Sequence, residues 1–592
     1  MSRHCLRLLS PGLIAVLMFA AGTAQAAAPN LNQGVVSDLQ QMIPLHDGVH
    51  LAATVWRPLD QAKPLPVVLM ITPYVSDETH NRAVKWVQGG YVYVVVDVRG
   101  RGDSEGVFRP LYGGGPDGAE VVEWLAQQPW CDGRVATLGG SYRGMVQWEI
   151  LAQHPKHLVA LMPTAAVYPG YDFPNWKGVM PSYTAQWLAL TSGHTAHDQL
   201  FGDGDYWNTQ FARLYKSGAA FTTLAPLAAG NRPAFEEWMQ HHDYDAYWAA
   251  YNPDPREYAK VNIPILAITG YFDGDQPGEM RYYREFSQNA PAAELARLTL
   301  LMGPWDHPGT RYPQKQLGGL TFPDNSVLDI DHLQISWLDW VLKGGKRPEM
   351  LSDRVNYYVM GEGAEQWRHV ASLEALTDHV QKLYLSSVDG PAGDVFHSGR
   401  LVAAVPQDTS TDSFRSDPNS QDGLPTNDGS NFLTDQSSSF QKNTLVYQSD
   451  PLTAPATIAG YVRFTGSFSL DTPDADIGAE VDAVLPDGRT LVLGTDLVRA
   501  RYRRGMSRAA PVTPGEIEPY AFDGFYLTDQ HLPAGTRIRL LLTSVNTPFL
   551  ERNDNSGGAL GVEPTNHGRV ATVSVHLDAA HPSYLELPLA KD

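Results

Sequence analysis

The sequence predicts an α/β fold followed by a second, all-β domain. Short apolar runs of strand length recur through roughly the first 350 residues, and helical patterns lie between them. After about residue 350, short alternating segments separated by turn residues take over. Strands alternating with helices favour a largely parallel sheet with helices on both faces. The later pattern favours a two-sheet sandwich or jelly roll. A chain of 592 residues, 43% hydrophobic, has room for two or three domains.

The first 26 residues have the three parts of a secretory signal peptide. Two arginines come first, an apolar run continues to Phe19, and Ala24-Gln25-Ala26 supplies a small-residue cleavage pattern. The apolar run is shorter than a bilayer span, and no later stretch is apolar enough to cross one. We therefore expect residues 1–26 to be removed, no membrane span in the mature protein, and a periplasmic or secreted location.

Charge and cysteine content exclude several classes of protein. The formal net charge is −21, and it becomes more negative once the two signal arginines are removed. So acidic a chain is a poor partner for nucleic acid or for an anionic membrane. Cys5 leaves with the signal and Cys131 remains alone, so we expect no internal disulfide. Cys131 lies just before an apolar strand, and we interpret it as a packed structural thiol rather than a nucleophile.

The elements of the α/β part can be placed in order. A β-hairpin is expected over residues 41–56, with its turn at 46–48. Buried strands follow at 66–74, 91–100, 134–142, 263–273 and 298–307, with helices at about 117–128 and 335–344.

Residues 171–255 interrupt this rhythm, because they are rich in Trp, Tyr and His and look helical. An insertion between two sheet strands, where the strands end, would form a helical cap. We therefore assign residues 27–170 and 256–348 to the α/β core, and 349–592 to a C-terminal jelly-roll domain. Within that domain, the polar stretch 407–440 is expected to be a long loop.

The run Gly139-Gly140-Ser141-Tyr142-Arg143-Gly144 carries the main chemical signal. It follows an apolar strand and opens a helical run, which is the context of the nucleophile elbow of an α/β-hydrolase core. The second glycine falls one place later than in the usual G-x-S-x-G pattern, and a serine in a glycine-rich turn is also a common structural feature. The flanking strand and helix favour Ser141 as the nucleophile.

A nucleophilic serine needs a base, and the base needs an orienting acid. His307 follows the strand 298–307 and is the best placed histidine beyond the serine; the alternative is a surface loop histidine. Asp273 ends the strand 263–273, with Asp275 and Asp306 as rivals for the acid. Asp306 adjoins the base in sequence, so its side chain is expected to point elsewhere. All three triad candidates fall at carboxyl ends of strands, where such a sheet gathers its site.

The oxyanion hole needs donors aimed at the developing negative oxygen. One is expected to be the backbone N–H of Tyr142, the residue after the nucleophile. The other should come from the loop after the early strand that ends in Thr72-Pro73-Tyr74, where the Tyr74 phenol could donate. Taken alone, Tyr74 is more typical of half-buried packing.

Nearly the whole mature chain resembles one family of serine hydrolases: cocaine esterase, α-amino-acid ester hydrolases, glutaryl-type cephalosporin acylases and X-Pro dipeptidyl-peptidases. The segments that carry the resemblance include DGVHLAATVWRP, ITPY, VVVDVRGRGDSEG, GGSYRGMVQWE, ITGYFD, MGPWDH, LVYQSDPLTAPATIAG and LPDGRTLVLGTDLVRARYRRG. The resemblance implies Ser141, Asp273 and His307 as the triad, and the Tyr74 hydroxyl and Tyr142 N–H as oxyanion donors. It also implies the order hydrolase core, helical cap, jelly roll, and the glycine spacing found here.

The resemblance leaves the substrate open. Members that favour α-amino acyl groups carry a carboxylate cluster, two members of which follow the triad acid in a D-x-E-D arrangement. Here the run is Asp273-Gly274-Asp275-Gln276, so only Asp275 keeps a charge. Asp172 and Trp176, in the segment YDFPNWKG, are further candidates for the substrate pocket. No metal or cofactor motif is present in the sequence.

Two functions are therefore carried forward. The first is a serine hydrolase that cleaves a small ester, amide or short peptide, with aminoacyl and X-Pro dipeptidyl groups as options, through an acyl-enzyme on Ser141. The second is a carbohydrate- or surface-binding β domain attached to a catalytically inactive hydrolase core. Filled triad positions favour the first. The sequence leaves open whether the chain forms a homo-oligomer.

Overall fold

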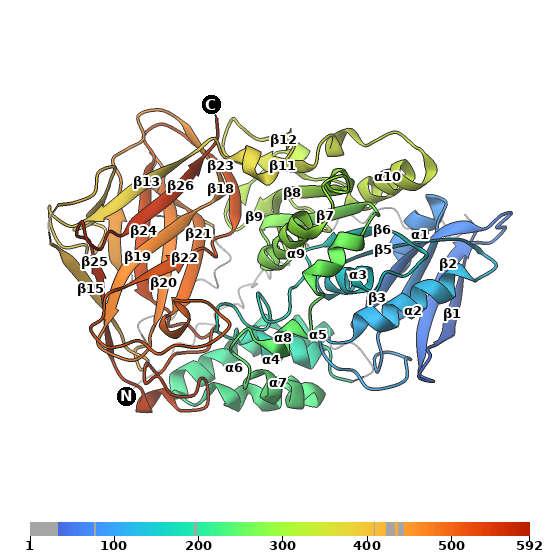
Figure 1. Cartoon of the computed structure of the whole chain (residues 1–592), viewed down its shortest axis with the longest axis horizontal. Helices are drawn as coiled ribbons and strands as arrows, with labels where there is room; N and C mark the ends of the chain where they lie inside the picture. The colour runs from blue at the N-terminus through green and yellow to red at the C-terminus, as the bar shows by residue number, and fades with distance from the viewer. Residues whose placement is uncertain are drawn as a thin grey trace, which may run out of the picture.

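The computed structural model describes residues 34–75, 79–193, 198–407, 409–421, 432–435 and 443–591. The expected signal peptide, residues 1–26, lies outside the described residues. Figure 1 shows three parts: a core of sheet and helices, a group of helices along its lower edge, and a β-rich domain beside both. Among the described residues, no helix combines the length and the apolar character that crossing a bilayer requires.

One sheet organises the core, with its strands in the order β1-β2-β4-β3-β5-β6-β7-β8-β11-β12. The pairs from β4 to β11 are parallel, and antiparallel pairs complete the two edges. The strands are β1 (Val35–Pro44), β2 (His50–Pro58), β3 (Leu65–Thr72), β4 (Val92–Asp97), β5 (Cys131–Gly140), β6 (Leu158–Thr164), β7 (Ile265–Phe272), β8 (Leu298–Asp306), β11 (Val355–Val359) and β12 (Gln366–Val370). The expected hairpin and all five expected strands are confirmed.

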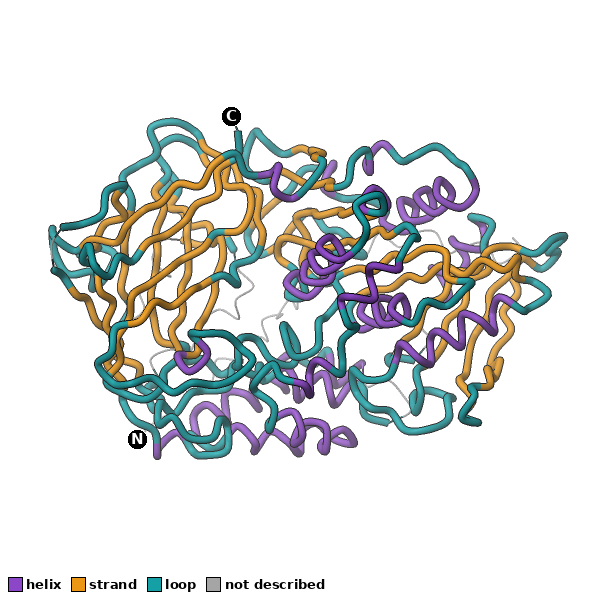
Figure 2. Tube along the Cα trace, in the orientation of Figure 1, coloured by secondary structure: helices purple, strands orange, loops and turns teal. Residues whose placement is uncertain are grey.

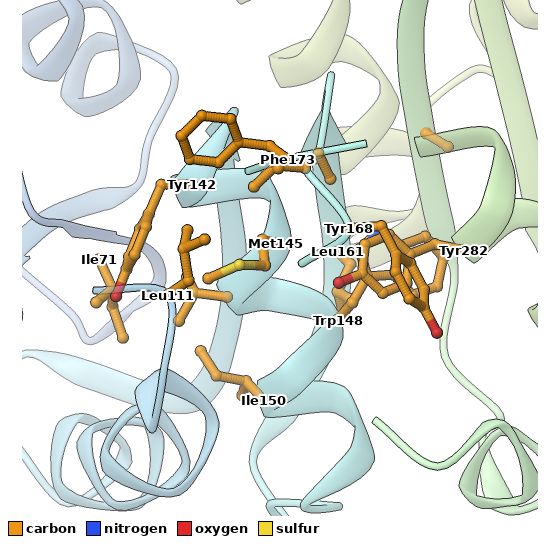
Figure 3. Close-up of a cluster of buried hydrophobic side chains, with 14 of the residues drawn as sticks. Ile71, Leu111, Tyr142, Met145, Trp148, Ile150, Leu161, Tyr168, Phe173 and Tyr282 are labelled. Atoms are coloured by element: carbon orange, nitrogen blue, oxygen red, sulfur yellow. The ribbon is translucent and has the colours of Figure 1, made fainter. Parts of the chain in front are cut away.

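Helices cover both faces of this sheet, as the alternation of strand sequence and helical sequence predicts. They are α1 (His80–Gln88), α2 (Gly114–Ala126), α3 (Tyr142–Ala152), α9 (Gln276–Asn289) and α10 (Ile330–Lys343). Alternate residues of β3 show the two faces: Val67 and Leu69 pack in the core that contains α2, α3 and α9, and Val68 packs in the core that contains α1 and α10. Figure 3 shows the first core around α3, where Trp148 stacks on Tyr282 at a centroid distance of 5.3 Å.

The core sheet continues about 20 residues beyond the domain boundary expected at residue 348/349. The segment VNYYVM looked like the first strand of the β domain, but β11 pairs in parallel with β8 and β12 pairs with β11. The reason is that a buried parallel edge strand has the same short apolar pattern as a strand of a sandwich. The core sheet therefore ends at Val370.

The inserted helical segment, residues 171–255, contains helices and no strand among its described residues. Its helices are α4 (Tyr183–Leu190), α5 (Asp198–Phe201), α6 (Gly204–Ser217), α7 (Arg232–Trp238) and α8 (Ala246–Ala249). In Figure 1 they lie along the lower edge of the molecule, below both the core and the β-rich domain.

The β domain contains the strands β13 to β26, which form one hydrogen-bonded sheet system. They are β13 (His379–Ser386), β14 (Gly399–Val402), β15 (Thr411–Ser416), β16 (Leu433–Asp435), β17 (Leu445–Gln448), β18 (Ala456–Tyr461), β19 (Arg463–Leu470), β20 (Asp476–Val484), β21 (Arg489–Arg499), β22 (Glu518–Phe522), β23 (Leu527–Leu532), β24 (Arg537–Ser544), β25 (Ala571–His576) and β26 (Tyr584–Leu589). Figure 2 shows that helix is scarce in this part. The expected long loop at 407–440 is wrong in part, since β15 and β16 fall within it and pair with β25 and β21.

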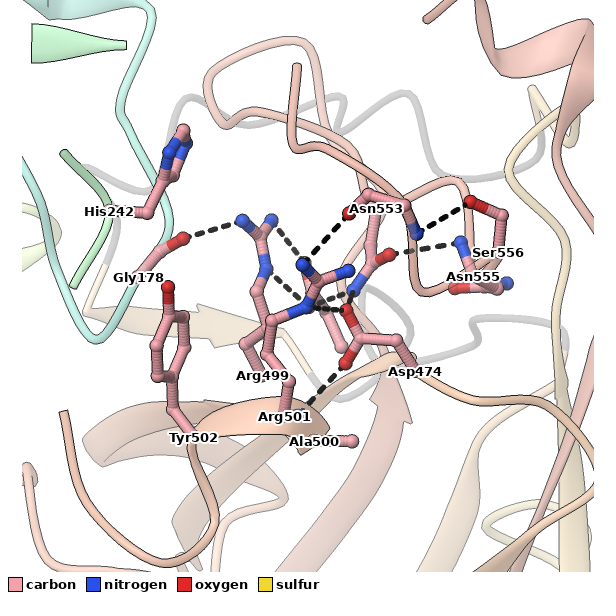
Figure 4. Close-up of polar contacts among 12 residues, drawn as sticks. Gly178, His242, Asp474, Arg499, Ala500, Arg501, Tyr502, Asn553, Asn555 and Ser556 are labelled. Atoms are coloured by element: carbon pink, nitrogen blue, oxygen red, sulfur yellow. Dashed lines mark hydrogen bonds and ion pairs between the residues drawn. The ribbon is translucent and has the colours of Figure 1, made fainter. Parts of the chain in front are cut away.

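A buried network of ion pairs and hydrogen bonds in the β domain reaches the inserted helical segment through Gly178 and His242. Arg499 contacts Asp476 (Nε–Oδ1, 2.8 Å) and Glu551 (Nη1–Oε2, 3.0 Å) and also donates to the carbonyl of Gly178. His242 of the inserted segment lies 3.1 Å from Glu551. Figure 4 shows Arg499 reaching Gly178 across this contact. We call this group, together with Asp474, Arg501 and Asn553, the junction network.

Each arginine of the junction network contacts at least one carboxylate. Arg501 contacts Asp474 (Nε–Oδ2, 2.6 Å), and Asn553 donates to both Asp474 and Asp476 at 2.8 Å (Figure 4). Two of the three aspartates in the segment 471–476, Asp474 and Asp476, therefore form ion pairs with arginines. Elsewhere, Cys131 is buried and free, in agreement with the expected structural thiol.

Candidate active site

Ser141 stands at a sharp turn between β5 and α3. Its backbone has φ 64° and ψ −129°, a conformation that is costly for a residue with a side chain. Its N–H donates to Thr164 (2.9 Å) and Ala165 (3.1 Å) at the end of β6, which holds the turn in place. A strand, a strained serine and a helix in succession form the arrangement of a nucleophile elbow.

The glycines around Ser141 are required by close approach. A Cβ on Gly139 would lie 2.5 Å from the Cβ of Arg143, and Gly139 has φ 144°. A Cβ on Gly144 would lie 3.0 Å from both the Cβ of Ala166 and the carbonyl oxygen of Thr164. The late second glycine of the sequence motif is thus the position where α3 meets the end of β6.

Asp273 and His307 come together as expected. Asp273 is completely buried, and its Oδ1 lies 2.8 Å from His307 Nδ1. Its Oδ2 accepts a hydrogen bond from Thr269 Oγ1 at 3.1 Å. His307 remains accessible, with 32% of its side chain exposed. A buried, fixed carboxylate on Nδ1 leaves the other ring nitrogen available as a base.

The rival acids lie in different positions. Asp275 Oδ2 is 3.6 Å from the same His307 nitrogen, which is 0.8 Å longer than the Asp273 contact. Asp306 Oδ1 instead accepts the N–H of Gly309 at 2.8 Å, so it stabilises the loop after β8. The geometry therefore favours Asp273 as the partner of His307.

The Ser141 side chain interacts with both the Tyr74 phenol and the Asp275 carboxyl. Burial raises the pKa of Tyr74, so its phenol keeps its proton and can donate. The Tyr74 oxygen also accepts a hydrogen bond from Trp187 Nε1 at 3.1 Å. Tyr142 is the first residue of α3, where a backbone N–H has no acceptor within the helix. Both expected oxyanion donors thus lie beside Ser141.

Asp172, which the sequence left uncertain, is close enough to Asp275 to repel it. Asp172 Oδ1 accepts the N–H of Tyr168 at 2.7 Å, while its Oδ2 is buried without a hydrogen-bond partner. Burial, followed by the Asp275 charge, raises the pKa of Asp172 well above its usual range. Burial also raises the pKa of Asp275, to about 6. Two neighbouring carboxyls with raised pKa values suit a cationic group.

Trp176 lies nearby on the inserted helical segment. Its ring meets that of Tyr526 edge-on at a centroid distance of 6.4 Å. It therefore borders the β domain, on the same chain segment as Asp172.

Sequence reasoning missed the residues that reach the site from distant parts of the chain. Leu527 of the β domain exchanges two backbone hydrogen bonds with the Gln276 side chain (2.7 and 3.2 Å). Tyr526 donates to the carbonyl of Gly274 at 3.2 Å. The loop that follows Asp273 is therefore supported by the β domain. Nothing local in the sequence indicates contacts that span about 250 residues, nor the contact of Trp187 with Tyr74.

The described residues contain no group of three or more His, Cys, Asp or Glu side chains arranged to hold a metal ion.

Two family profiles match consecutive parts of the chain. The X-Pro dipeptidyl-peptidase (S15 family) profile matches residues 47–309, and the X-Pro dipeptidyl-peptidase C-terminal non-catalytic domain profile matches residues 350–586. Together they span the core, the inserted helical segment and the β domain.

Individual relatives agree over nearly the full length. Cocaine esterase from Rhodococcus sp. (strain MB1 Bresler) is 28% identical over 595 residues, covering 95% of this chain and 99% of that protein. An α-amino acid ester hydrolase structure superposes with a TM-score of 0.81 at 21% identity, covering 97% of this chain and all of that one. An aminopeptidase from a marine-sediment Thaumarchaeota archaeon gives 0.80 at 22% identity, covering 96% and 99%. The two structures establish a shared fold.

Proposed function

Because the chain belongs to the X-Pro dipeptidyl-peptidase (S15) family of hydrolases, we propose that it is a serine hydrolase that cleaves ester or amide bonds through an acyl-enzyme on Ser141. The observation that carries this proposal is the 2.8 Å contact between buried Asp273 and His307, assembled beside the strained elbow of Ser141. A core that had lost catalysis, the alternative considered above, would have no need to keep this arrangement.

The reaction follows from the positions of the protons. Asp273 holds the proton on His307 Nδ1, so the other ring nitrogen takes the proton of the Ser141 hydroxyl as it attacks the carbonyl. The oxygen of that carbonyl becomes negative and is stabilised by the Tyr74 hydroxyl and the Tyr142 N–H. His307 then protonates the leaving group, and the acyl group remains on Ser141.

Deacylation repeats these steps with water as the nucleophile. His307 removes a proton from a water molecule, which attacks the acyl-enzyme carbonyl, and the same two donors stabilise the second oxyanion. Protonated His307 returns its proton to the Ser141 oxygen as the acid product leaves. The 32% exposure of His307 gives water a route to it.

Asp172 and Asp275 support a finer proposal about the substrate, that its acyl group carries an α-ammonium group. The Asp275 carboxyl interacts with Ser141, and the Asp275 charge is the second cause, after burial, of the raised pKa of Asp172. A cation between the two carboxyls would relieve this repulsion. A charge-assisted hydrogen bond of this kind contributes about 1.5–3 kcal/mol, or about 10- to 100-fold in kcat/KM.

A pair of esters that differ only in the amino group tests both the hydrolase proposal and the proposal of amino-group recognition. We expect the wild type at pH 7 to hydrolyse methyl phenylglycinate with a kcat/KM at least about 10-fold above that for methyl phenylacetate. Asp172→Asn and Asp275→Asn should each reduce this ratio by about 10-fold or more. Ser141→Ala should hydrolyse neither ester.

The outcomes separate the two proposals. An equal ratio in the wild type and both Asn variants would reject amino-group recognition and leave the hydrolase intact. Undiminished hydrolysis by Ser141→Ala would reject the acyl-enzyme.

A further inference from the structure

Two arginines beside Ser141 have no carboxylate partner. Arg143 lies two residues after Ser141, on α3, and Arg311 lies in the loop that follows His307. Within the part of the chain that the structure describes, neither forms an ion pair. Arg143 Nη1 contacts Met70 Sδ at 3.7 Å, and its Nε is buried without an acceptor. Arg311 Nη1 contacts Thr310 Oγ1 at 3.5 Å, at the limit of a hydrogen bond.

Both guanidinium groups lie close to the reacting atoms. Arg311 Nη1 packs against the residue before the nucleophile, since a Cβ on Gly140 would lie 2.4 Å from it. The Arg143 guanidinium carbon is 5.4 Å from the ring centre of Tyr74, the expected oxyanion donor. As whole residues, Arg143 and Arg311 are each half-buried rather than fully buried.

Holding these two charges here costs free energy. Burial lowers the pKa of the Arg311 guanidinium, and the Arg143 charge lowers it further. Asp273 and Asp275 attract Arg311 only at longer range, and Asp273 is already bound to His307 and Thr269. Partly desolvated arginines normally gain a carboxylate in compensation.

A neighbouring arginine shows what compensation looks like. Arg82 binds Asp331 at 2.6 Å (Nε–Oδ1) and donates to Gln334 at 2.9 Å. Arg143 and Arg311 have hydrogen-bond donors of the same kind without these acceptors. A planar guanidinium with free donors binds carboxylates with two parallel hydrogen bonds.

We propose that Arg143 and Arg311 form a subsite that binds a carboxylate group of the substrate. The proposal rests on the hydrolase function proposed above and deepens it, because it predicts a preference for esters or amides that carry a negative charge near the scissile bond. The carboxylate can belong to the acyl group or to the leaving group, and the two are distinguished by the choice of ester.

The test uses two ester pairs, each an anion and its uncharged primary amide. Mono-4-nitrophenyl adipate and its amide place the charge on the acyl group. 4-Acetoxybenzoate and 4-acetoxybenzamide place it on the leaving group. In each pair the measured quantity is the ratio of kcat/KM for the anion to that for the amide. We expect Arg143→Gln and Arg311→Gln each to reduce this ratio by about 10- to 100-fold in one pair. The responding pair identifies the side that carries the carboxylate.

A matched control removes an arginine charge near the start of β5, the strand that leads to Ser141. Arg134 lies near the start of β5 and pairs with Asp132 at 2.6 Å. Arg134→Gln should leave both ratios unchanged. Ratios that change by less than about 3-fold in Arg143→Gln and in Arg311→Gln, for both pairs, would overturn the proposal.

Binding measurements keep the test independent of turnover and of the variants' folding. In the full-length wild type, calorimetry should give a Kd at least about 10-fold lower for adipate than for adipamide, or for 4-hydroxybenzoate than for 4-hydroxybenzamide. Equal affinities within both pairs would overturn the subsite. If Ser141→Ala retained hydrolysis but the carboxylates still bound selectively, the mechanism would fail and the subsite would stand.

Discussion

Arginines in two regions of this chain have opposite surroundings. In the junction network, Arg499 and Arg501 are buried, and each contacts a carboxylate within 3 Å. Beside Ser141, Arg143 and Arg311 are half-buried without an ion pair among the described residues. The first region has its charges matched within the fold, so its role is to hold the inserted helical segment against the β domain. The second region has unmatched charges, which suits groups that act on a ligand.

The same contrast holds for the acids. Asp476 and Glu551 are bound by Arg499, while Asp172 keeps a buried oxygen without a partner. We expect substitution of a charged residue that has an ion-pair partner to change the stability of the fold. We expect substitution of a charged residue beside Ser141 that has no such partner to change substrate preference. The following predictions test this division.

The largest effect is expected at the acid of the triad. Asp273→Asn should lower kcat by about 10⁴-fold, because an amide can donate to His307 Nδ1 and favour the wrong tautomer. Asp275→Asn and Asp306→Asn should retain kcat within about 10-fold, since neither makes the 2.8 Å contact. The measurement is kcat on one activated ester, with melting temperature as the check on folding. If Asp273→Asn were active and Asp275→Asn inactive, Asp275 and not Asp273 would be the acid of the triad.

The next effect is on stability alone. Arg499→Leu should lower the free energy of unfolding by about 3–5 kcal/mol, because it removes the arginine partner of two buried carboxylates. The exposed pair Arg400–Asp450 is the control, and Arg400→Leu should cost less than about 1 kcal/mol. Urea unfolding measures both. Equal losses for the two variants would show that burial of the ion pairs is irrelevant.

The junction should also show a defined pH dependence. Burial raises the pKa of Glu551, but His242 and Arg499 outweigh it and hold that pKa at about 2, below its usual value of 4.5. A lowered carboxyl pKa stabilises the fold above the unfolded value, and this stabilisation is lost as pH falls from about 4.5 through about 2. The contribution is about 3 kcal/mol at neutral pH. We expect the stability difference between wild type and Glu551→Gln to shrink between pH 6 and pH 2.5, and a constant difference would refute the assignment.

The smallest of these effects concerns the oxyanion. Tyr74→Phe should lower kcat by about 10²-fold and leave KM nearly unchanged, as expected for the loss of one donor. The Tyr74 hydroxyl accepts a hydrogen bond from Trp187, so Trp187→Phe is a second variant to measure, and it should reduce kcat less than Tyr74→Phe does. Unchanged kcat in Tyr74→Phe would leave the tyrosine with a packing role.

The sequence predicted what depends on local pattern. The strand ends that carry Ser141, Asp273 and His307 are each marked by an apolar run and a turn, so their convergence follows from the parallel sheet. It did not predict β11 as part of that sheet, because a parallel edge strand and a sandwich strand have the same pattern. Contacts such as Leu527 with Gln276 depend on the packing of distant segments. The sequence also could not show that Arg143 and Arg311 have no ion-pair partner, because the residues around them come from distant parts of the chain.

The most direct test of the central claim is covalent labelling of the nucleophile. The full-length protein is treated with a fluorophosphonate, and the adduct is located by mass spectrometry of its peptides. A serine activated by His307 and Asp273 should form one adduct, on Ser141, with none in Ser141→Ala and much slower labelling in Asp273→Asn. An adduct on a different residue, or undiminished labelling of Ser141→Ala, would contradict the account.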